Sequence, residues 1–272
     1  MKPIIKWVGG KTQLLDSIHN LMPAKYGKYF EPFVGGGALL LDLAPAAASA
    51  NDINPELINM YRQVKEHVDT VIEYLTDLDK AHESFEDAKS FYYLVRDNFN
   101  QNLNTNTAEQ AARLIYLNKH CFNGLYRVNS TGEFNVPFNG KKSGNSFDAD
   151  HLREASKQLK AVEFTLGDFA DSVVDAASGD FVFFDSPYAP LTPTSFTDYT
   201  AEGFSYEDHV RLANLFRELT AKGVYCMLTN HDTEFVRELY RDFNTVVVDV
   251  RRSINSKGDS RKGREVIITN YN

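Results

Sequence analysis

Short apolar runs that end at glycine, proline or acidic residues recur through the first 54 residues and again after residue 148. Between these runs, apolar residues recur every three or four positions, which is the spacing of an amphipathic helix. Strands that alternate with helices are typical of α/β folds. The pattern predicts helices at 14–21, from 38, at 149–159, from 205 and after 232, and strands from 29 and at 48–50, 162–166, 181–184, 224–228 and 245–250.

The pattern changes between residues 55 and 148, where helical spacing is followed by an Asn- and Gly-rich stretch. Ser84 and Asp87 are spaced as a capping box that would begin the second of these helices. Asn123-Gly124 and Thr131-Gly132 are typical of hairpin turns. Helical spacing predicts helices at 55–78, 85–99 and 107–120. We therefore expect a helical and β-hairpin domain at 55–148, inserted into an α/β domain made of 1–54 and 149–272.

Composition limits the class of protein. The chain has 272 residues, 43% of them hydrophobic, which is enough for one large core with a satellite domain. A net charge of −8 argues against a protein that coats nucleic acid but allows a local basic groove. No apolar run reaches membrane length and no signal peptide is evident, so we expect a cytoplasmic protein without a membrane partner. Cys121 and Cys226 are isolated, with neither metal-site spacing nor a disulfide framework.

Candidate chemistry stands at the end of the apolar run 181–184, which continues into Asp185, Ser186, Pro187 and Tyr188. In open α/β sheets, ligands bind just beyond the carboxyl ends of the strands. The Asp185 carboxylate and the Ser186 carbonyl could accept the two N–H bonds of an exocyclic amine such as adenine N6, and so localise its lone pair. Pro187 makes the turn rigid, and Tyr188 offers a stacking face worth about 1–3 kcal/mol for a base. The alternative for these residues alone is a strand followed by an Asx-type turn.

Near the N-terminus, Gly10-Lys11-Thr12 is similar to the end of a phosphate-binding P-loop. That motif also needs a glycine where Ile5 stands, and no hydrophobic strand precedes the turn, so we reject an NTPase. What remains is a glycine turn that leads into a helix. Trp7 and Lys11 flank this turn, and Trp7 could wall a ligand pocket or belong to the core.

A second glycine turn, Gly35 to Gly37, lies between a strand and a helix, as at the start of a Rossmann-like unit. Its glycines let a ligand approach the backbone closely. Asp52 follows the next strand, where an acid binds the hydroxyls of a ribose. The spacing is not G-x-G-x-x-G and basic residues are missing, which favours a nucleoside without phosphates: S-adenosylmethionine (SAM) rather than NAD. Asp168, at another strand end, could bind the adenine of that ligand.

Two segments suit contact with DNA. The ribbon, which we define as residues 119–142, combines aromatic residues with four basic residues and a single acid, a composition that suits insertion into a groove. An ordinary surface hairpin is the alternative. Residues 251–264 hold six basic residues against Asp259 alone, which fits either a phosphate-binding loop or a solvated charged loop. Residues 189–203 form a Pro-, Thr- and Ser-rich loop long enough to be a lid.

Taken in order, four motifs resemble the DNA adenine-N6 methyltransferases of the Dam type: Trp7-x-Gly-Gly-Lys11, Glu31-Pro-Phe-x-Gly-Gly-Gly37, Asn51-Asp52 and Asp185-Ser-Pro-Tyr188. The resemblance covers essentially the whole chain. It implies a Rossmann-like SAM-dependent methyltransferase domain, with SAM as the methyl donor and S-adenosyl-L-homocysteine as the product. It assigns catalysis to residues 185–188 and assigns the binding of SAM to Trp7, Lys11, Phe33, Gly35, Asp52, Asp168 and Asp185.

The same resemblance implies that the target adenine is flipped out of duplex DNA while the ribbon reads the flanking bases. Arg127 would read a guanine with support from Leu125 and Asn129, and Phe122 and Asn123 would lie near the opened base step. Pro137 belongs to the same ribbon motif. The ribbon is similar to those of members that methylate GATC. We expect a monomer that needs no metal, and a role in restriction–modification is one of those left open.

One departure from the family pattern is Ser186, where the usual motif is Asp-Pro-Pro-Tyr. A serine keeps the backbone carbonyl but loses the fixed φ of proline.

Two other classes of protein remain open from the residues. A methyltransferase for RNA or for a protein glutamine would share the strand-end motif, and a DNA-binding regulator without turnover would share the ribbon.

Overall fold

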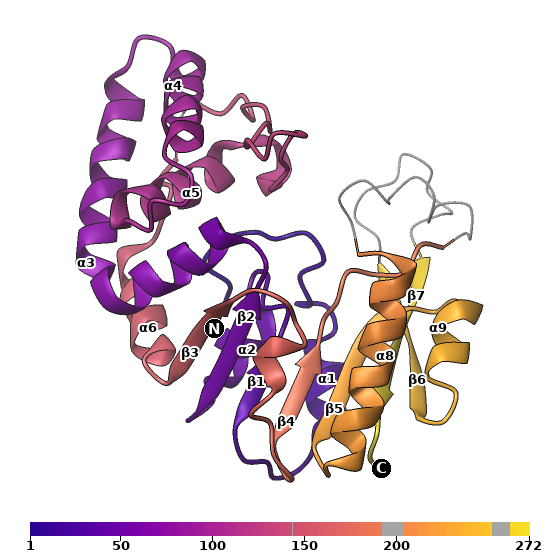
Figure 1. Cartoon of the computed structure of the whole chain (residues 1–272). Coiled ribbons are helices and arrows are strands. Elements are labelled where there is room, and N and C mark those ends of the chain that lie inside the picture. The colour runs from indigo at the N-terminus through magenta and orange to yellow at the C-terminus, as the bar shows by residue number, and fades with distance from the viewer. Residues whose placement is uncertain (143, 192–203, 252–261) are drawn as a thin grey trace. The chain divides into compact units, whose positions relative to one another are not determined.

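The computed structural model describes residues 1–142, 144–191, 204–251 and 262–272 (Figure 1). Its internal contacts group into two compact units. Unit 1 comprises Met1–Gly10, Val34–Pro45 and Asn51–Gly167. Unit 2 comprises Lys11–Phe33, Ala46–Ala50 and Asp168–Asn272. The domain division predicted from the sequence stays a prediction.

The strands form one seven-stranded sheet in the order β3-β2-β1-β4-β5-β7-β6. β1 pairs in parallel with β2 and β4, β4 pairs in parallel with β5, and β7 runs antiparallel to β5 and β6. The order reverses between β1 and β4, and such a reversal is where α/β proteins bind ligands. This sheet confirms the predicted α/β class. The strands are β1 (Tyr29–Glu31), β2 (Ala48–Asp52), β3 (Val162–Leu166), β4 (Phe181–Phe184), β5 (Tyr225–His231), β6 (Asn244–Arg251) and β7 (Lys262–Thr269).

Unit 2 surrounds β4, all four residues of which are buried. A capping box of Ser205 and Asp208 begins α8 (Tyr206–Ala221), which packs on β5 and buries Leu212 and Phe216 against the strand residues (Figure 1). After α8 the chain turns at Gly223, where φ is +80°. The shorter helices of this unit are α1 (Leu15–Leu21), η2 (Asp171–Val173) and α9 (Glu234–Leu239).

Unit 1 is mainly helical in its described residues. Asn54 caps α3 (Pro55–Ser84) through the amide of Leu57, and the helix is interrupted at His67, where φ is −134°. The C-terminal part of α3 packs with α4 and α5 (Figure 1). Within the described ranges, each helix is too short or too polar to span a membrane. The other helices of this unit are α2 (Ala38–Leu43), α4 (Ala88–Gln101), α5 (Ala108–His120), η1 (Phe122–Gly124) and α6 (Ala149–Leu159).

Two local predictions were wrong. Ser84 ends α3 and does not cap α4; Asp87 caps α4 instead, accepting from the amides of Lys89 and Ser90. The ribbon is not a continuous hairpin, because its pairing is limited to the isolated bridges Cys121↔Phe138 and Val128↔Phe134. A side chain explains part of this: Asn100 of α4 binds both the amide and the carbonyl of Phe134, at 2.8 and 3.1 Å, and so takes the place of a strand partner.

Candidate active site

Asp185 immediately follows β4, and the neighbouring strand β5 supplies one of its partners. The parallel register pairs Phe184 with Leu228, so the next residues, Asp185 and Thr229, lie side by side. Thr229 Oγ1 donates to Asp185 Oδ1 at 2.9 Å. Lys11 Nζ lies 2.6 Å from the same oxygen, and only 5% of Lys11 is exposed. The structure therefore brings together two residues that the sequence predicted separately, Lys11 and Asp185, and adds Thr229.

Burial and charge act in opposite directions on the Asp185 carboxyl. Burial raises its pKa above the ordinary value, and the nearby charge of Glu265 raises it further. The ammonium of Lys11 and the hydroxyl of Thr229 lower it. Lys11 and Thr229 both bind Oδ1, and through this oxygen they stabilise the ionised carboxylate. The proposed contact with a substrate amine concerns the other oxygen, Oδ2. The ionised carboxylate can accept hydrogen bonds at both oxygens, and it is a stronger acceptor than the protonated form.

Ser186 is 2% exposed, and its hydroxyl has no hydrogen-bond partner among the described residues. An unpartnered buried hydroxyl costs about 1–3 kcal/mol. Pro187, in contrast, is exposed. The side chain of Ser186 therefore gives the fold no hydrogen bond, which leaves its backbone carbonyl as the group with a predicted role.

Contacts on several sides hold the ring of Tyr188. Its hydroxyl donates to Glu265 Oε2 at 2.7 Å, and Lys11 Nζ lies 4.6 Å from the ring centroid. The His231 ring packs edge-on at 4.8 Å and 75°. His231 is itself fixed, because its Nδ1–H donates to the Ala189 carbonyl at 2.8 Å.

Thr229, His231 and Glu265 were not predicted from the sequence. One signal could have found Thr229 and His231, since both lie at the carboxyl end of the strand next to β4. Glu265 had no such signal, because an antiparallel strand, β7, brings it beside His231.

Phe33 and Asp168 also belong to unit 2, but they have different neighbours. Phe33 stacks on Phe169 with centroids 5.2 Å apart. Asp168 Oδ1 accepts from the amide of Ala170 and from Arg211 Nη2, both at 2.9 Å. Asp168 is therefore a half-exposed carboxylate in an ion pair with Arg211, and its predicted contact with an adenine stays a prediction.

Unit 1 holds the second glycine turn and Asp52. The two carboxylate oxygens of Asp52 accept from the amides of Gly35 and Asn54, both at 3.0 Å. Burial raises the pKa of Asp52 above its ordinary value, and these amides lower it. A carboxylate has about four acceptor positions, so Asp52 could also receive a ribose hydroxyl. The structure thus brings Gly35 and Asp52 together, as the sequence predicted.

The glycines of this turn are sterically required. Gly35 has φ +46°, and a Cβ there would lie 2.9 Å from Trp7 Cδ1. Gly37 has φ +63°, and a Cβ there would lie 2.7 Å from the hydroxyl of Tyr61. That hydroxyl donates to the Gly35 carbonyl at 2.9 Å. A bare backbone wall next to a half-buried carboxylate fits the nucleoside part of SAM.

Trp7 contacts the ribbon within unit 1. Its ring stacks on Tyr126 with centroids 4.9 Å apart and an angle of 25°. The backbone amide and carbonyl of Lys6 bind the side chain of Asn118, at 2.9 and 2.8 Å. Trp7 and Lys11 flank one turn in the sequence but belong to different units. Tyr126 was not assigned a role from the sequence.

The predicted DNA-binding residues line the ribbon with mixed exposure. Phe122 is 52% exposed, and Asn123 is exposed with φ +57°. Arg127 is exposed and its Nε donates to Asn135 at 2.7 Å. Asn129 closes the following turn, since its Oδ1 accepts from the amides of Thr131 and Glu133. Leu125 is half-buried, and the carbonyl of the exposed Pro137 accepts from the Phe122 amide at 2.8 Å.

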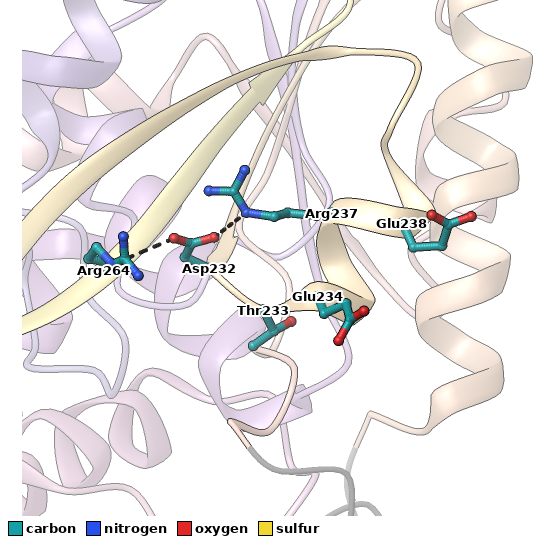
Figure 2. Close-up of a pocket in the computed structure, with 6 residues that line it drawn as sticks. All are labelled: Asp232, Thr233, Glu234, Arg237, Glu238 and Arg264. Atoms are coloured by element: carbon teal, nitrogen blue, oxygen red, sulfur yellow. Dashed lines mark hydrogen bonds and ion pairs between the residues drawn. The ribbon is translucent and has the colours of Figure 1, made fainter.

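A surface pocket beside α9 is a separate feature (Figure 2). Figure 2 shows Arg237 and Arg264 on either side of Asp232, with nitrogen–oxygen distances of 2.6 and 3.7 Å. The pocket is lined by Asp232, Thr233, Glu234, Arg237, Glu238 and Arg264. Of these residues, Arg264 belongs to the predicted basic segment 251–264, and the sequence assigned no role to the others. The described part of the chain also lacks a cluster of three or more side chains suited to a metal ion.

Comparison with known proteins gives consistent matches. A family model described as D12 class N6 adenine-specific DNA methyltransferase matches residues 7–254. A type II methyltransferase of Lactococcus lactis subsp. cremoris is 45% identical, over 100% of this chain and 96% of the relative. A type II methyltransferase of Methanocaldococcus jannaschii is also 45% identical, over 100% and 99%. A DNA adenine methylase of Haemophilus influenzae is 36% identical, over 98% and 92%.

Proposed function

This chain belongs to the D12 class N6 adenine-specific DNA methyltransferases, and from that premise we propose that it methylates adenine N6 within GATC in duplex DNA after flipping the adenine out of the helix. The enzyme is a SAM-dependent, adenine-specific DNA methyltransferase. The site sequence, the base flipping and the residue roles are the proposal.

One observation supports the chemistry above the others: Lys11 and Thr229 both bind Oδ1 of Asp185 at the end of β4. In the proposed mechanism, Asp185 Oδ2 and the carbonyl of Ser186 accept hydrogen bonds from the two N–H groups of the target amine. This draws the N6 lone pair out of the ring and makes the nitrogen nucleophilic. When bound, SAM supplies a methyl carbon on a sulfonium leaving group, so no strong base is needed.

The remaining contacts position the base and control its environment. Tyr188 would stack on the flipped adenine, and its ring orientation is set by Glu265 and His231. The ammonium of Lys11 lowers the pKa of Asp185 and so favours the ionised carboxylate, against the effect of burial. Positioning and fixed charges therefore supply the catalysis. The assignments of Phe33, Lys11 and Asp168 to the cofactor stay predictions.

For recognition, we assign Arg127 to a guanine of the site and Phe122 and Asn123 to the opened base step. Their exposure supports this assignment. Arg127 would exchange Asn135 for the guanine edge, where arginine makes a bidentate contact. Because two relatives are named type II methyltransferases, we infer that this chain serves as a modification enzyme that protects DNA. That it acts as a monomer stays a prediction.

Methyl transfer from tritiated SAM tests the proposal. Substrates are a GATC duplex, the same duplex with the adenine replaced, the matching RNA and a glutamine peptide. We expect label only in the GATC duplex and recovered as N6-methyladenine. Labelled RNA or peptide would indicate another substrate class, and binding without a single turnover would indicate a regulator. A GATC duplex with 2-aminopurine at the target should gain fluorescence on binding if the base is flipped.

A further inference from the structure

We propose that Glu265 is a positioning residue for the methylation reaction: by accepting the Tyr188 hydroxyl, it fixes the ring on which the target adenine stacks. The proposal rests on the proposed function of Tyr188. It adds a role for β7, which lies outside the motif at residues 185–188.

The geometry is specific. The Tyr188 hydroxyl and Glu265 Oε2 are 2.7 Å apart, a short distance that suits a hydrogen bond to a charged acceptor. Burial raises the pKa of Tyr188 well above its ordinary value, so the phenol keeps the proton that it donates. Glu265 lies opposite His231 in the antiparallel pairing of β7 with β5, and His231 packs on the edge of the same ring. Neighbouring strands thus hold Tyr188 by its hydroxyl and by its edge.

The negative charge of Glu265 makes ionisation of Asp185 less favourable, which argues against Glu265 being an incidental surface carboxylate. Glu265 raises the pKa of Asp185 and so opposes the ionised form that the reaction needs. Among the described residues, Glu265 forms no ion pair that would offset this charge. Its carboxylate accepts a hydrogen bond from the Tyr188 hydroxyl. The benefit that we assign to Glu265 is the orientation of the aromatic ring.

A glutamine at position 265 separates orientation from charge. Glu265→Gln keeps an acceptor for the Tyr188 hydroxyl, so it should retain kcat to within about threefold. It also removes a negative charge, which should lower the pKa of Asp185 and shift the acidic limb of the pH–rate profile to lower pH. Glu265→Ala removes the acceptor as well, and should lower kcat about 10- to 100-fold, because a misoriented stacking ring misplaces the target amine. The KM for SAM should not change.

A double-mutant cycle with Tyr188→Phe tests the route. If Glu265 acts through the hydroxyl, Glu265→Ala should have no further effect on kcat in the Tyr188→Phe background. Glu238→Ala is the matched control, because it removes an exposed negative charge that pairs with Arg241 on the same unit. We expect that control to keep the wild-type kcat.

Three results would overturn the proposal: wild-type kcat in Glu265→Ala, additive losses in the double variant, or wild-type kcat in Tyr188→Phe. Tyr188→Phe removes only a hydroxyl group, so this variant still tests the proposal if Glu265→Ala does not fold. An inactive wild-type enzyme would instead count against the proposed function, since the cycle compares variants with the wild type.

Discussion

At the scale of single residues, Lys11 decides how the site depends on pH. Burial raises the pKa of Asp185 and the ammonium of Lys11 lowers it, so removing Lys11 leaves only the weaker effect of the Thr229 hydroxyl to oppose the rise. Lys11→Met should therefore move the acidic limb of the pH–rate profile to higher pH, because the ionised Asp185 carboxylate is the strong acceptor that polarises the N6–H group. The profile of kcat against pH for wild type and variant measures this. An unchanged limb would mean that Asp185 is not the group that titrates.

Ser186 permits a second test at this scale. Its buried hydroxyl has no partner among the described residues, and only its backbone carbonyl has a proposed role. Ser186→Pro keeps that carbonyl, removes the unpartnered hydroxyl and fixes φ. We expect kcat to stay the same or rise, and the free energy of unfolding to stay the same or rise. Kinetics and urea unfolding of the variant measure both, and loss of turnover in a folded variant would refute the carbonyl role.

The residues of the site differ in how readily the sequence predicted them. Asp185, Lys11, Gly35 and Asp52 belong to local motifs, and the structure pairs Lys11 with Asp185 and Gly35 with Asp52. Glu265 could not be found in this way, since its contact with Tyr188 spans 77 positions and depends on strand pairing.

At the scale of elements, the glycine turn before α2 has no room for a Cβ atom at position 37, and two glycine-to-alanine variants can test this steric requirement. Gly37→Ala should weaken SAM binding about tenfold or more, because its Cβ would displace the Tyr61 hydroxyl from the Gly35 carbonyl. Gly132→Ala is the control: Gly132 has φ +81°, but a Cβ there would meet nothing within 4 Å. Calorimetric titration with SAM measures both. Equal affinities in the two variants would contradict this role of the turn.

The end of α5 contains a buried histidine that makes unit 1 sensitive to acid. His120 Nε2 binds Ser146 Oγ at 3.1 Å, its ring stacks on His82, and Ser146 in turn binds Asp79. Burial, and then the charge of His82, lower the pKa of His120 to about 4. The pKa of His82 is lowered as well, while the pKa of Asp79 is raised by burial.

The folded state therefore favours neutral His120. As the pH falls below the ordinary pKa of histidine, the unfolded chain takes up a proton at His120 before the folded chain does, and this lowers the free energy of unfolding of unit 1. Stability should be unaffected above about pH 6.5 and fall by about 3 kcal/mol as the pH approaches 4. His120→Asn, which can still bind Ser146, should reduce that loss. Urea unfolding between pH 4 and 7.5 measures it, and identical slopes for wild type and variant would contradict the assignment.

The elements themselves followed the hydrophobic pattern closely where packing is local. The buried run of β4 and the capping box of α8 are where the sequence placed them. The ribbon was predicted less well, because Asn100 in α4 satisfies the backbone of Phe134 in place of a strand. The predicted lid at 189–203 and the basic segment at 251–264 fall largely outside the described residues.

At the scale of the whole molecule, a chain of net charge −8 acts on a polyanion, so its DNA contacts depend on where positive residues are placed. The ribbon of unit 1 carries predicted recognition residues, and unit 2 carries Asp185 and Tyr188. Family membership shows that the chain acts on DNA, and the roles of these two sets of residues are our proposal. The central claim is that the Asp185 carboxylate activates the target amine.

The most direct measurement is N6-methyladenine formed on a GATC duplex by Asp185→Ala and by the wild type, counted from tritiated SAM after digestion to nucleosides. Binding of the same duplex is measured in parallel. We predict that the wild type forms N6-methyladenine, while Asp185→Ala binds the duplex with similar affinity and forms none above background. An Asp185→Ala enzyme that methylates adenine at the wild-type rate would contradict the account.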